Sequence, residues 1–169
     1  MKTPKIGLDI DGVLADFSMA WHLVYPEINP RPNTWYLDDK ISERFKTMRN
    51  NGTLNEFYLG IEPLLNPNDI PFEPHCYITS RPVPQEISEQ WLDKHGFPNK
   101  KVISLNIATS KIDAAKEAGI EIFVDDFYEN FVELNKSGIT TYLYTQPWNI
   151  MYDVGSLRIN SLKDLPLLK

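Results

Sequence analysis

The 169-residue sequence contains one cysteine, Cys76, and no run of about 18 apolar residues. A single cysteine excludes a disulfide within the chain, and the missing apolar run argues against a transmembrane helix. The opening stretch MKTPKIGLDID also lacks the long apolar segment of a secretory signal. We therefore expect a cytoplasmic protein without a membrane partner, in which Cys76 packs as a small hydrophobic side chain.

Histidine and positive charge are also scarce. The three histidines are scattered and, with one cysteine, do not form the ligand spacing of a zinc site. The 17 Lys and Arg residues are outnumbered by 23 Asp and Glu residues, for a net charge of −6. This balance argues against a nucleic-acid polymer as partner, because such binding rests on Lys and Arg neutralising phosphates. A small phosphorylated substrate is compatible with it, since a bound metal reverses the local field. The oligomeric state is left open, a homodimer included.

Short apolar stretches alternate with helix-like ones over most of the chain. The later helix-like stretches, PVPQEISEQWLDKHG, SKIDAAKEAG and YENFVELNKSG, each stop at a glycine, which is a common helix terminator. Strands that alternate with helices indicate a parallel sheet in an α/β domain. We expect the strands at 5–10, 75–79, 101–105, 120–124 and 140–144.

Residues 16–74 interrupt this alternation with many aromatic residues and prolines. We expect helices at about 16–25 and 39–50 there, and no strand. An insertion after the first strand lies over the carboxyl ends of the strands, where open α/β sheets bind ligands. We therefore predict a core of residues 1–15 and 75–169 and a small helical cap of residues 16–74 that closes on the site. The alternative is a structural excursion without a role in binding.

Two carboxylates end the first predicted strand, in the stretch IGLDIDGVLADF. Asp9 and Asp11 are two residues apart, so in a strand they point to the same face, and Gly12 lets the chain turn sharply after them. Two crowded carboxylates repel each other, and a divalent cation relieves that repulsion. One could then act as a nucleophile and the other as a general acid. The alternative is an Asp-Gly turn that only ends the strand.

A second acidic pair, Asp125 and Asp126, ends the apolar stretch IEIFVDD in the same way. Parallel strands bring their carboxyl ends to one edge of a sheet, so both pairs could meet around one metal ion. Oxygen ligands around a small, hard cation suggest Mg²⁺.

Three further polar residues have placements that suit a phosphate. Thr79 and Ser80 follow the predicted strand in YITSRP, where hydroxyl and main-chain N–H groups can donate to phosphate oxygens. Lys111 lies in the first turn of the predicted helix in ATSKIDAAK, where the helix dipole disfavours a cation unless it has an anionic partner. Each is weak alone, because a Ser or Thr is usually only a helix cap.

Taken in order, DIDGV, YITS, SK and FVDD resemble the four motifs of the haloacid dehalogenase (HAD) superfamily of phosphohydrolases. The resemblance implies a Rossmann-like, three-layer core and an aspartyl-phosphate mechanism. It implies that Asp9 attacks phosphorus, that Asp11 protonates the leaving oxygen and then activates water, and that Lys111 steadies Asp9 and the phosphate. It further implies that Thr79 binds the phosphoryl group. The implied Mg²⁺ ligands are Asp9, the main-chain carbonyl of Asp11, and Asp126, with Asp125 acting through water or behind the ligands.

Within that superfamily, DIDGVLADF, EFYLGIEPL and LYTQPWN are similar to the 5′(3′)-deoxyribonucleotidases. This resemblance implies a nucleotide substrate whose base stacks on aromatic residues of the cap. The motif TSRP departs from the family at Arg81, which we expect to add a phosphate contact or to alter the substrate. The stacking candidates are Phe17, which matches directly, and Trp35 or Tyr36 and Phe57 or Tyr58, which match approximately.

Three functions remain open at this point. The first is a phosphatase of nucleoside monophosphates, and the second a phosphatase of sugar phosphates or nucleic-acid 3′ ends. The third is a non-catalytic phosphate- and metal-binding module. We interpret Trp21 and Tyr25 as core and the pair at 38–39 as acids that open a helix. For Trp148 and Asn149 we favour a role in shaping a loop, and the alternative is that they line the edge near the site.

Overall fold

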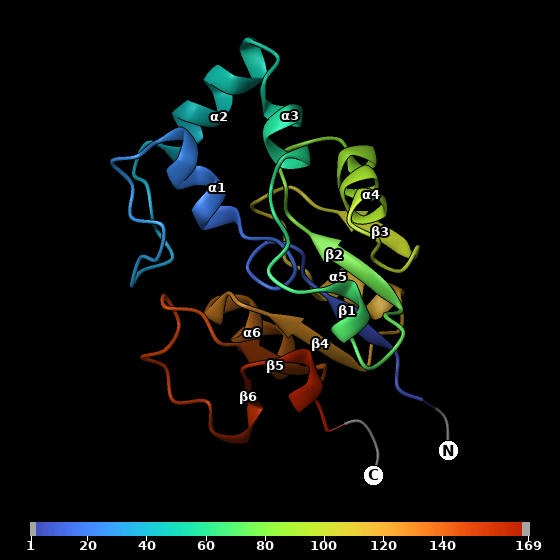
Figure 1. Cartoon of the computed structure of the whole chain (residues 1–169). Helices are drawn as coiled ribbons and strands as arrows, with labels where there is room; N and C mark the ends of the chain where they lie inside the picture. Colours follow the sequence, from blue (N-terminus) through green and yellow to red (C-terminus); the bar gives the residue numbers. More distant parts are fainter. Residues whose placement is uncertain (1–2, 167–169) are drawn as a thin grey trace.

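The computed structural model describes residues 3–166 and contains one parallel, six-stranded sheet in an α/β fold (Figure 1). The predicted core boundaries at residues 1 and 169 therefore lie outside the described residues. The strand order is β3-β2-β1-β4-β5-β6, and every pair is parallel. The strands are β1 (Ile6–Leu8), β2 (Cys76–Thr79), β3 (Lys101–Ser104), β4 (Ile122–Asp125), β5 (Thr140–Tyr144) and β6 (Arg158–Ile159).

The α/β prediction is confirmed, and the five expected strands all exist, with each end within two residues of its predicted position. The sixth strand, β6, was not predicted, because it is only two residues long and has no apolar stretch. The three helices expected between the later strands are α4 (Gln85–Lys94), α5 (Ile112–Glu117) and α6 (Tyr128–Lys136).

Alternating side chains of the strands form two apolar layers, one on each face of the sheet. In β2, Tyr77 packs with the layer that contains Trp91 of α4, whereas Ile78 packs with the layer that contains Ala115 of α5. This alternation follows from the period of two in a strand, and both faces are buried because helices cover both. The fold therefore has three layers, with the sheet in the middle.

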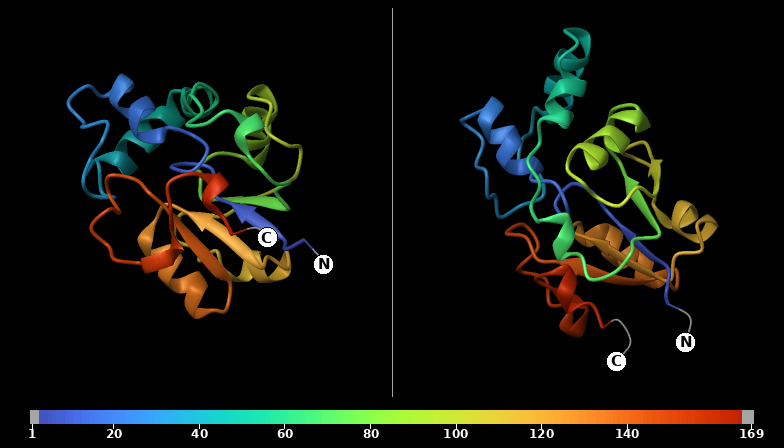
Figure 2. Two further views of the ribbon diagram at one scale, coloured as in Figure 1. Left: turned by 60° about the horizontal axis from the view of Figure 1, so that its bottom comes forward. Right: turned by 45° about the vertical axis from the view of Figure 1, so that its right-hand side comes forward.

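The segment between β1 and β2 carries three helices of its own, α1 (Phe17–Val24), α2 (Ile41–Asn50) and α3 (Leu54–Leu59), and one 3₁₀ turn, η1 (Pro67–Asp69). The first two correspond to the predicted helices, whereas α3 was not expected. The chain enters and leaves this group side by side, because Asp16 N–H donates to the carbonyl of Glu62, and Leu64 N–H to that of Leu14. Figures 1 and 2 show that the three helices stand together at one end of the molecule, away from β6.

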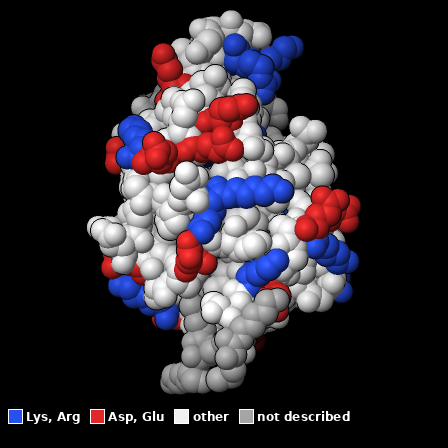
Figure 3. Space-filling model, turned by 90° about the vertical axis from the view of Figure 1, so that its right-hand side faces the viewer, with Lys and Arg blue, Asp and Glu red and all other residues white. Residues whose placement is uncertain are grey.

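Two surface properties bear on possible partners. No helix in the described part of the chain is both long and apolar enough to cross a membrane. On the face shown in Figure 3, basic side chains lie beside acidic ones rather than together over a broad area.

Candidate functional site

The sheet order brings the predicted polar residues to one place. Strands β2, β1 and β4 are neighbours, and β1 occupies the centre, with the chain continuing to either side of it. Thr79 ends β2, Asp9 follows β1, and Asp125 ends β4 with Asp126 directly after it. The carboxyl ends of strands at such a switch point are where open α/β sheets bind ligands.

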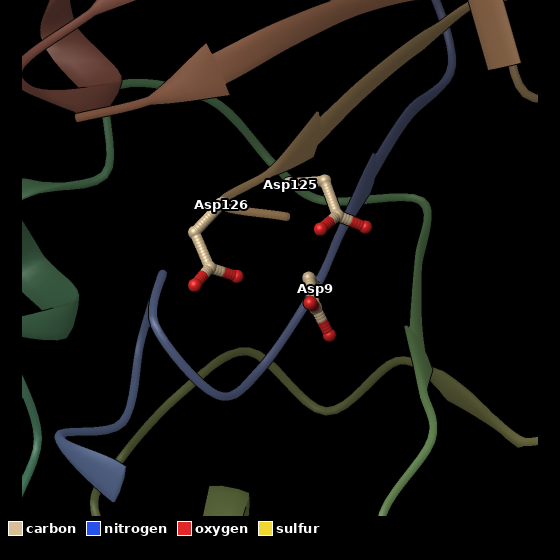
Figure 4. Close-up of side chains that lie close together, drawn as sticks. All are labelled: Asp9, Asp125 and Asp126. Carbon is tan, nitrogen blue, oxygen red and sulfur yellow. The ribbon is translucent and has the colours of Figure 1, made fainter. Parts of the chain in front are cut away.

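The three aspartates Asp9, Asp125 and Asp126 form a buried cluster in which one carboxylate oxygen of each lies within 4.8 Å of the others. Figure 4 shows Asp9, from the end of β1, and the pair from the end of β4 turned toward a common space. Burial, with repulsion by Asp125 and Asp11, raises the pKa of Asp9 to about 7 despite the lowering effect of Lys111. Burial and the charges of Asp9 and Asp125 likewise raise the pKa of Asp126.

Lys111 supplies the one positive charge inside this cluster. It occupies the position just before α5, not the first turn as expected, and only 3% of the residue is exposed. Its Nζ lies 2.8 Å from Asp125 Oδ2 and 3.0 Å from Asp9 Oδ2. Burial alone lowers the pKa of this lysine, but the charges of Asp125 and Asp9 outweigh it and raise that pKa. Lys111 is therefore held charged beside the predicted nucleophile.

The shifted pKa of Asp9 predicts that the metal-free protein loses stability as pH rises from about 4 to 7. Between its ordinary pKa of 3.8 and about 7, the unfolded chain has released a proton that the folded protein retains, so folding is progressively disfavoured. One pKa unit corresponds to about 1.4 kcal/mol, so the upper limit is on the order of 4 kcal/mol. The free energy of unfolding in urea, measured without metal at pH 4, 5.5 and 8, tests this trend. For Asp9→Asn, this free energy should depend less on pH than for the wild type. Parallel curves for the two proteins would contradict it.

A divalent cation fits this cluster. Three carboxylates lie close together, Lys111 pairs with two of them, and among residues 3–166 the buried Oδ1 of Asp126 has no hydrogen-bond donor. Gly12, with φ of +81°, lets the backbone lie against Asp126, because a Cβ there would come within 2.1 Å of Asp126 Oδ2. Asp125 is already used by Lys111 Nζ, Phe127 N–H and Asn130 Nδ2. Asp126 Oδ1 is thus the oxygen of the cluster that is left open for a metal, beside Asp9, whose Oδ1 accepts from Ile10 N–H at 2.7 Å and whose Oδ2 pairs with Lys111.

Asp11 and Arg81 form a bidentate ion pair. Arg81 Nε and Nη2 donate to the two oxygens of Asp11 at 2.9 and 2.8 Å, and the Arg81 side chain is fully buried. The guanidinium also lies over the rings of Tyr58 and Trp91. Arg81, which we expected to add a phosphate contact or to alter the substrate, thus holds Asp11. Its Nη1 is buried without a partner among the described residues.

A cavity of about 450 Å³ opens between this cluster and the helical segment. Its walls include the predicted phosphate-binding residues Thr79 and Ser80, and much of the rest is apolar. Of the predicted stacking residues, four line it, namely Phe17, Trp35, Tyr36 and Tyr58.

Phe57 does not line the cavity. Its ring packs edge-on against Phe17 at 5.7 Å and against Trp21 at 5.4 Å, within an aromatic cluster behind the wall. Trp21 is fully buried, as its interpretation as core predicted. Of the adjacent pair 57–58, it is therefore Tyr58 that lines the cavity.

The pair at 38–39 does not cap the helix. The helix α2 begins at Ile41, after Lys40, and no side chain caps it. Asp38 is instead buried, and accepts hydrogen bonds from Trp21 Nε1 at 2.8 Å and from Lys40 N–H at 2.9 Å. The tryptophan that pairs with it lies 17 residues earlier, so the local sequence could not show this role.

The sequence also did not predict that the loop after β5 contacts the acidic cluster. Trp148 Nε1 donates to Asp126 Oδ2 at 2.9 Å, and Asn149 Nδ2 donates to the carbonyl of Asp126 at 2.8 Å. Gln146 Nε2 donates to the carbonyl of Gly12 at 2.7 Å. The resemblance of LYTQPWN to a known family was the signal available, and it did not reveal that this loop contacts the acidic cluster.

Comparisons with known proteins show the fold. No family model and no curated protein sequence matches the chain. Among solved structures, it is similar to an L-2-haloacid dehalogenase (TM-score 0.61, 10% identity, 97% of this chain and 98% of that one). It is also similar to a HAD hydrolase of family IA, variant 3, from Entamoeba histolytica (TM-score 0.59, 14% identity, 96% and 95%). These identities are low, so the likeness establishes a HAD-like fold and leaves the reaction to be argued from the site.

Proposed function

We propose that this protein is a Mg²⁺-dependent phosphomonoesterase that dephosphorylates nucleoside monophosphates, deoxynucleotides included, through an aspartyl-phosphate. The observation that carries the proposal is the buried cluster of Asp9, Asp125 and Asp126 around Lys111. The three carboxylates carry more negative charge than Lys111 can neutralise, so a bound cation would stabilise the cluster. The cation and Lys111 together would then attract the negative charge of a phosphate. Mg²⁺ would be held by Asp9, Asp126 and the main-chain carbonyl of Asp11, and would stabilise charge on the transferring phosphoryl group.

The residues divide the reaction into two steps. In the first, a carboxylate oxygen of Asp9 attacks phosphorus, the ester P–O bond breaks, and the leaving oxygen takes a proton from Asp11. In the second, water attacks phosphorus, the bond to Asp9 breaks, and Asp11 accepts the proton of that water. Arg81 donates to both oxygens of Asp11 and so orients this carboxylate as the base of the second step, and one of these hydrogen bonds would break for Asp11 to carry the proton of the first step.

The aromatic cavity is the argument for a nucleotide. Flat side chains near a phosphate site offer stacking faces to a base, and each base–aromatic stack is worth roughly 1–3 kcal/mol. Tyr36 is the clearest of these, because 73% of it is exposed although it lines the cavity. Trp35, by contrast, stacks on Phe127 with the ring centroids 4.3 Å apart. Phe17 stacks on Trp21 at 5.6 Å, so replacing it would also disturb packing.

A phosphate-release screen with Mg²⁺ tests the proposal. We expect kcat/KM for nucleoside monophosphates to exceed that for sugar phosphates by about 5- to 150-fold, which is the stacking energy expressed as a ratio. Tyr36→Ala should raise KM for nucleotides and leave a small alkyl phosphate nearly unaffected. Leu23→Ala is the matched control, because Leu23 is equally exposed but does not line the cavity.

The same screen contains the results that would overturn the proposal. Equal kcat/KM for sugar phosphates and nucleotides would reject nucleoside monophosphates as the preferred substrates. If nucleic-acid 3′-phosphates were the best substrates, the protein would instead be a phosphatase of nucleic-acid ends. Halide release from 2-haloacids without phosphate release from any ester would replace the activity itself with that named for one of the structural neighbours, the L-2-haloacid dehalogenase.

A further inference from the structure

We propose that Trp148 restricts Asp126 to a single metal-binding oxygen, and that this restriction makes the site selective for Mg²⁺ over the larger Ca²⁺. The inference rests on the proposed function only in that it concerns the metal of the same site. Trp148 is a positioning residue here, because it acts on the metal through its hydrogen bond to Asp126.

The two oxygens of the Asp126 carboxylate have different surroundings. Oδ2 accepts the hydrogen bond of Trp148 Nε1 at 2.9 Å. Oδ1 is buried, and within residues 3–166 it has no donor. The whole residue is inaccessible to solvent. The oxygen that remains for a cation is therefore Oδ1, while Oδ2 is occupied by an N–H group that a metal would have to displace.

The backbone confines the carboxylate from the other side. A Cβ built at Gly12 would lie 2.1 Å from Oδ2 but 2.8 Å from Oδ1, so it is Oδ2 that lies against the turn after Asp11. Gln146, two residues before Trp148, donates to the carbonyl of Gly12 at 2.7 Å and so ties the loop to this turn. Rotation of the carboxylate is thus opposed by the glycine turn on one side and the indole on the other.

The indole is itself held in place. Asn149, 1% exposed, donates from Nδ2 to the main-chain carbonyls of Asp126 and Tyr144, both at 2.8 Å. Trp35 meets the Trp148 ring edge-on with centroids 6.2 Å apart. A donor fixed in this way restricts a carboxylate more than a mobile one would, because little entropy is lost when its hydrogen bond forms.

Binding through one carboxylate oxygen affects selectivity because Mg²⁺ and Ca²⁺ differ in coordination number and geometry. Mg²⁺ requires near-octahedral geometry with ligands at about 2.0–2.1 Å, which a carboxylate binding through one oxygen satisfies. Ca²⁺ takes six to eight oxygens at about 2.3–2.6 Å and readily binds both oxygens of one carboxylate. A hydrogen bond that occupies Oδ2 therefore removes the binding mode that favours Ca²⁺.

The test is calorimetric titration of Trp148→Phe with Mg²⁺ and, separately, with Ca²⁺. The variant keeps an aromatic ring and loses only the donor group and part of the ring area. We expect its Kd for Mg²⁺ to rise by about tenfold, the lower end of the effect of removing a group that orients a metal ligand. Its Kd for Ca²⁺ should change much less or fall, so the ratio of the two constants moves toward Ca²⁺.

The control is Tyr152→Phe in the same loop, which removes a polar atom from a ring that stacks on Tyr128 and does not line the cavity, and its metal affinities should match those of the wild type. Thermal unfolding without metal checks that both variants fold. Equal losses for Mg²⁺ and Ca²⁺, or an unchanged Mg²⁺ affinity, would overturn the selectivity role while leaving the phosphatase proposal intact. A wild-type protein that binds neither cation but releases phosphate would overturn both this inference and the metal requirement.

Discussion

Replacing Asp9 with asparagine is expected to reduce kcat for phosphate release by roughly 10⁴- to 10⁶-fold, the range seen when a catalytic triad residue is removed. Asparagine keeps the shape of the side chain but lacks the charged oxygen that we propose attacks phosphorus. The loss should be the same for nitrophenyl phosphate and for a nucleotide, because both need the same nucleophile. Steady-state phosphate release with saturating Mg²⁺ measures it.

The Asp9 variant also separates chemistry from folding. Ionised Asp9 is unfavourable in the metal-free protein, because its burial raises its pKa to about 7. Asp9→Asn should therefore be at least as stable as the wild type at pH 8 without metal, although it is inactive. Asp113→Asn removes an exposed carboxylate at the start of α5 and should keep full activity. An Asp9→Asn protein with wild-type turnover would contradict the assignment of the nucleophile.

The second large effect is expected for Lys111→Met, which should lose both activity and stability. Lys111 is the partner of two buried carboxylates, at 2.8 and 3.0 Å, and methionine leaves both uncompensated. Removing one partner of a buried ion pair typically costs about 3–5 kcal/mol. Activity should fall as well, because the ammonium group that stabilises the phosphate is gone. Urea unfolding and phosphate release measure the two losses.

Mg²⁺ should restore part of the stability of Lys111→Met, but not its activity. A cation bound by Asp9 and Asp126 replaces some of the missing positive charge, whereas it cannot take the position of the ammonium group. Lys116→Met, on the exposed side of α5, is the matched control and should change neither property. A Lys111→Met protein as stable and as active as the wild type would show that the buried lysine is dispensable.

The HAD-like architecture and the acidic ends of its strands could be read from local sequence. A buried parallel strand is a short apolar run, and a polar residue directly after it stands out against that run. Asp9, Thr79 and the pair 125–126 all show this contrast. Because parallel strands share one edge, the sequence indicated that the two acidic pairs could meet around one metal ion.

Contacts between distant segments were decided only by the tertiary structure. Arg81 pairs with Asp11 across 70 residues, Gln146 binds the turn at Gly12 across 134, and Trp148 reaches Asp126 across 22. In the sequence, each of these residues lies in a loop. Neither hydrophobic periodicity nor composition predicts which loops become neighbours once the strands are ordered in the sheet. The sequence alone thus determined which strand ends carry the acids. Only the folded chain decided which oxygens of those acids are held and which remain free, because that depends on the directions of hydrogen bonds between loops far apart in the chain.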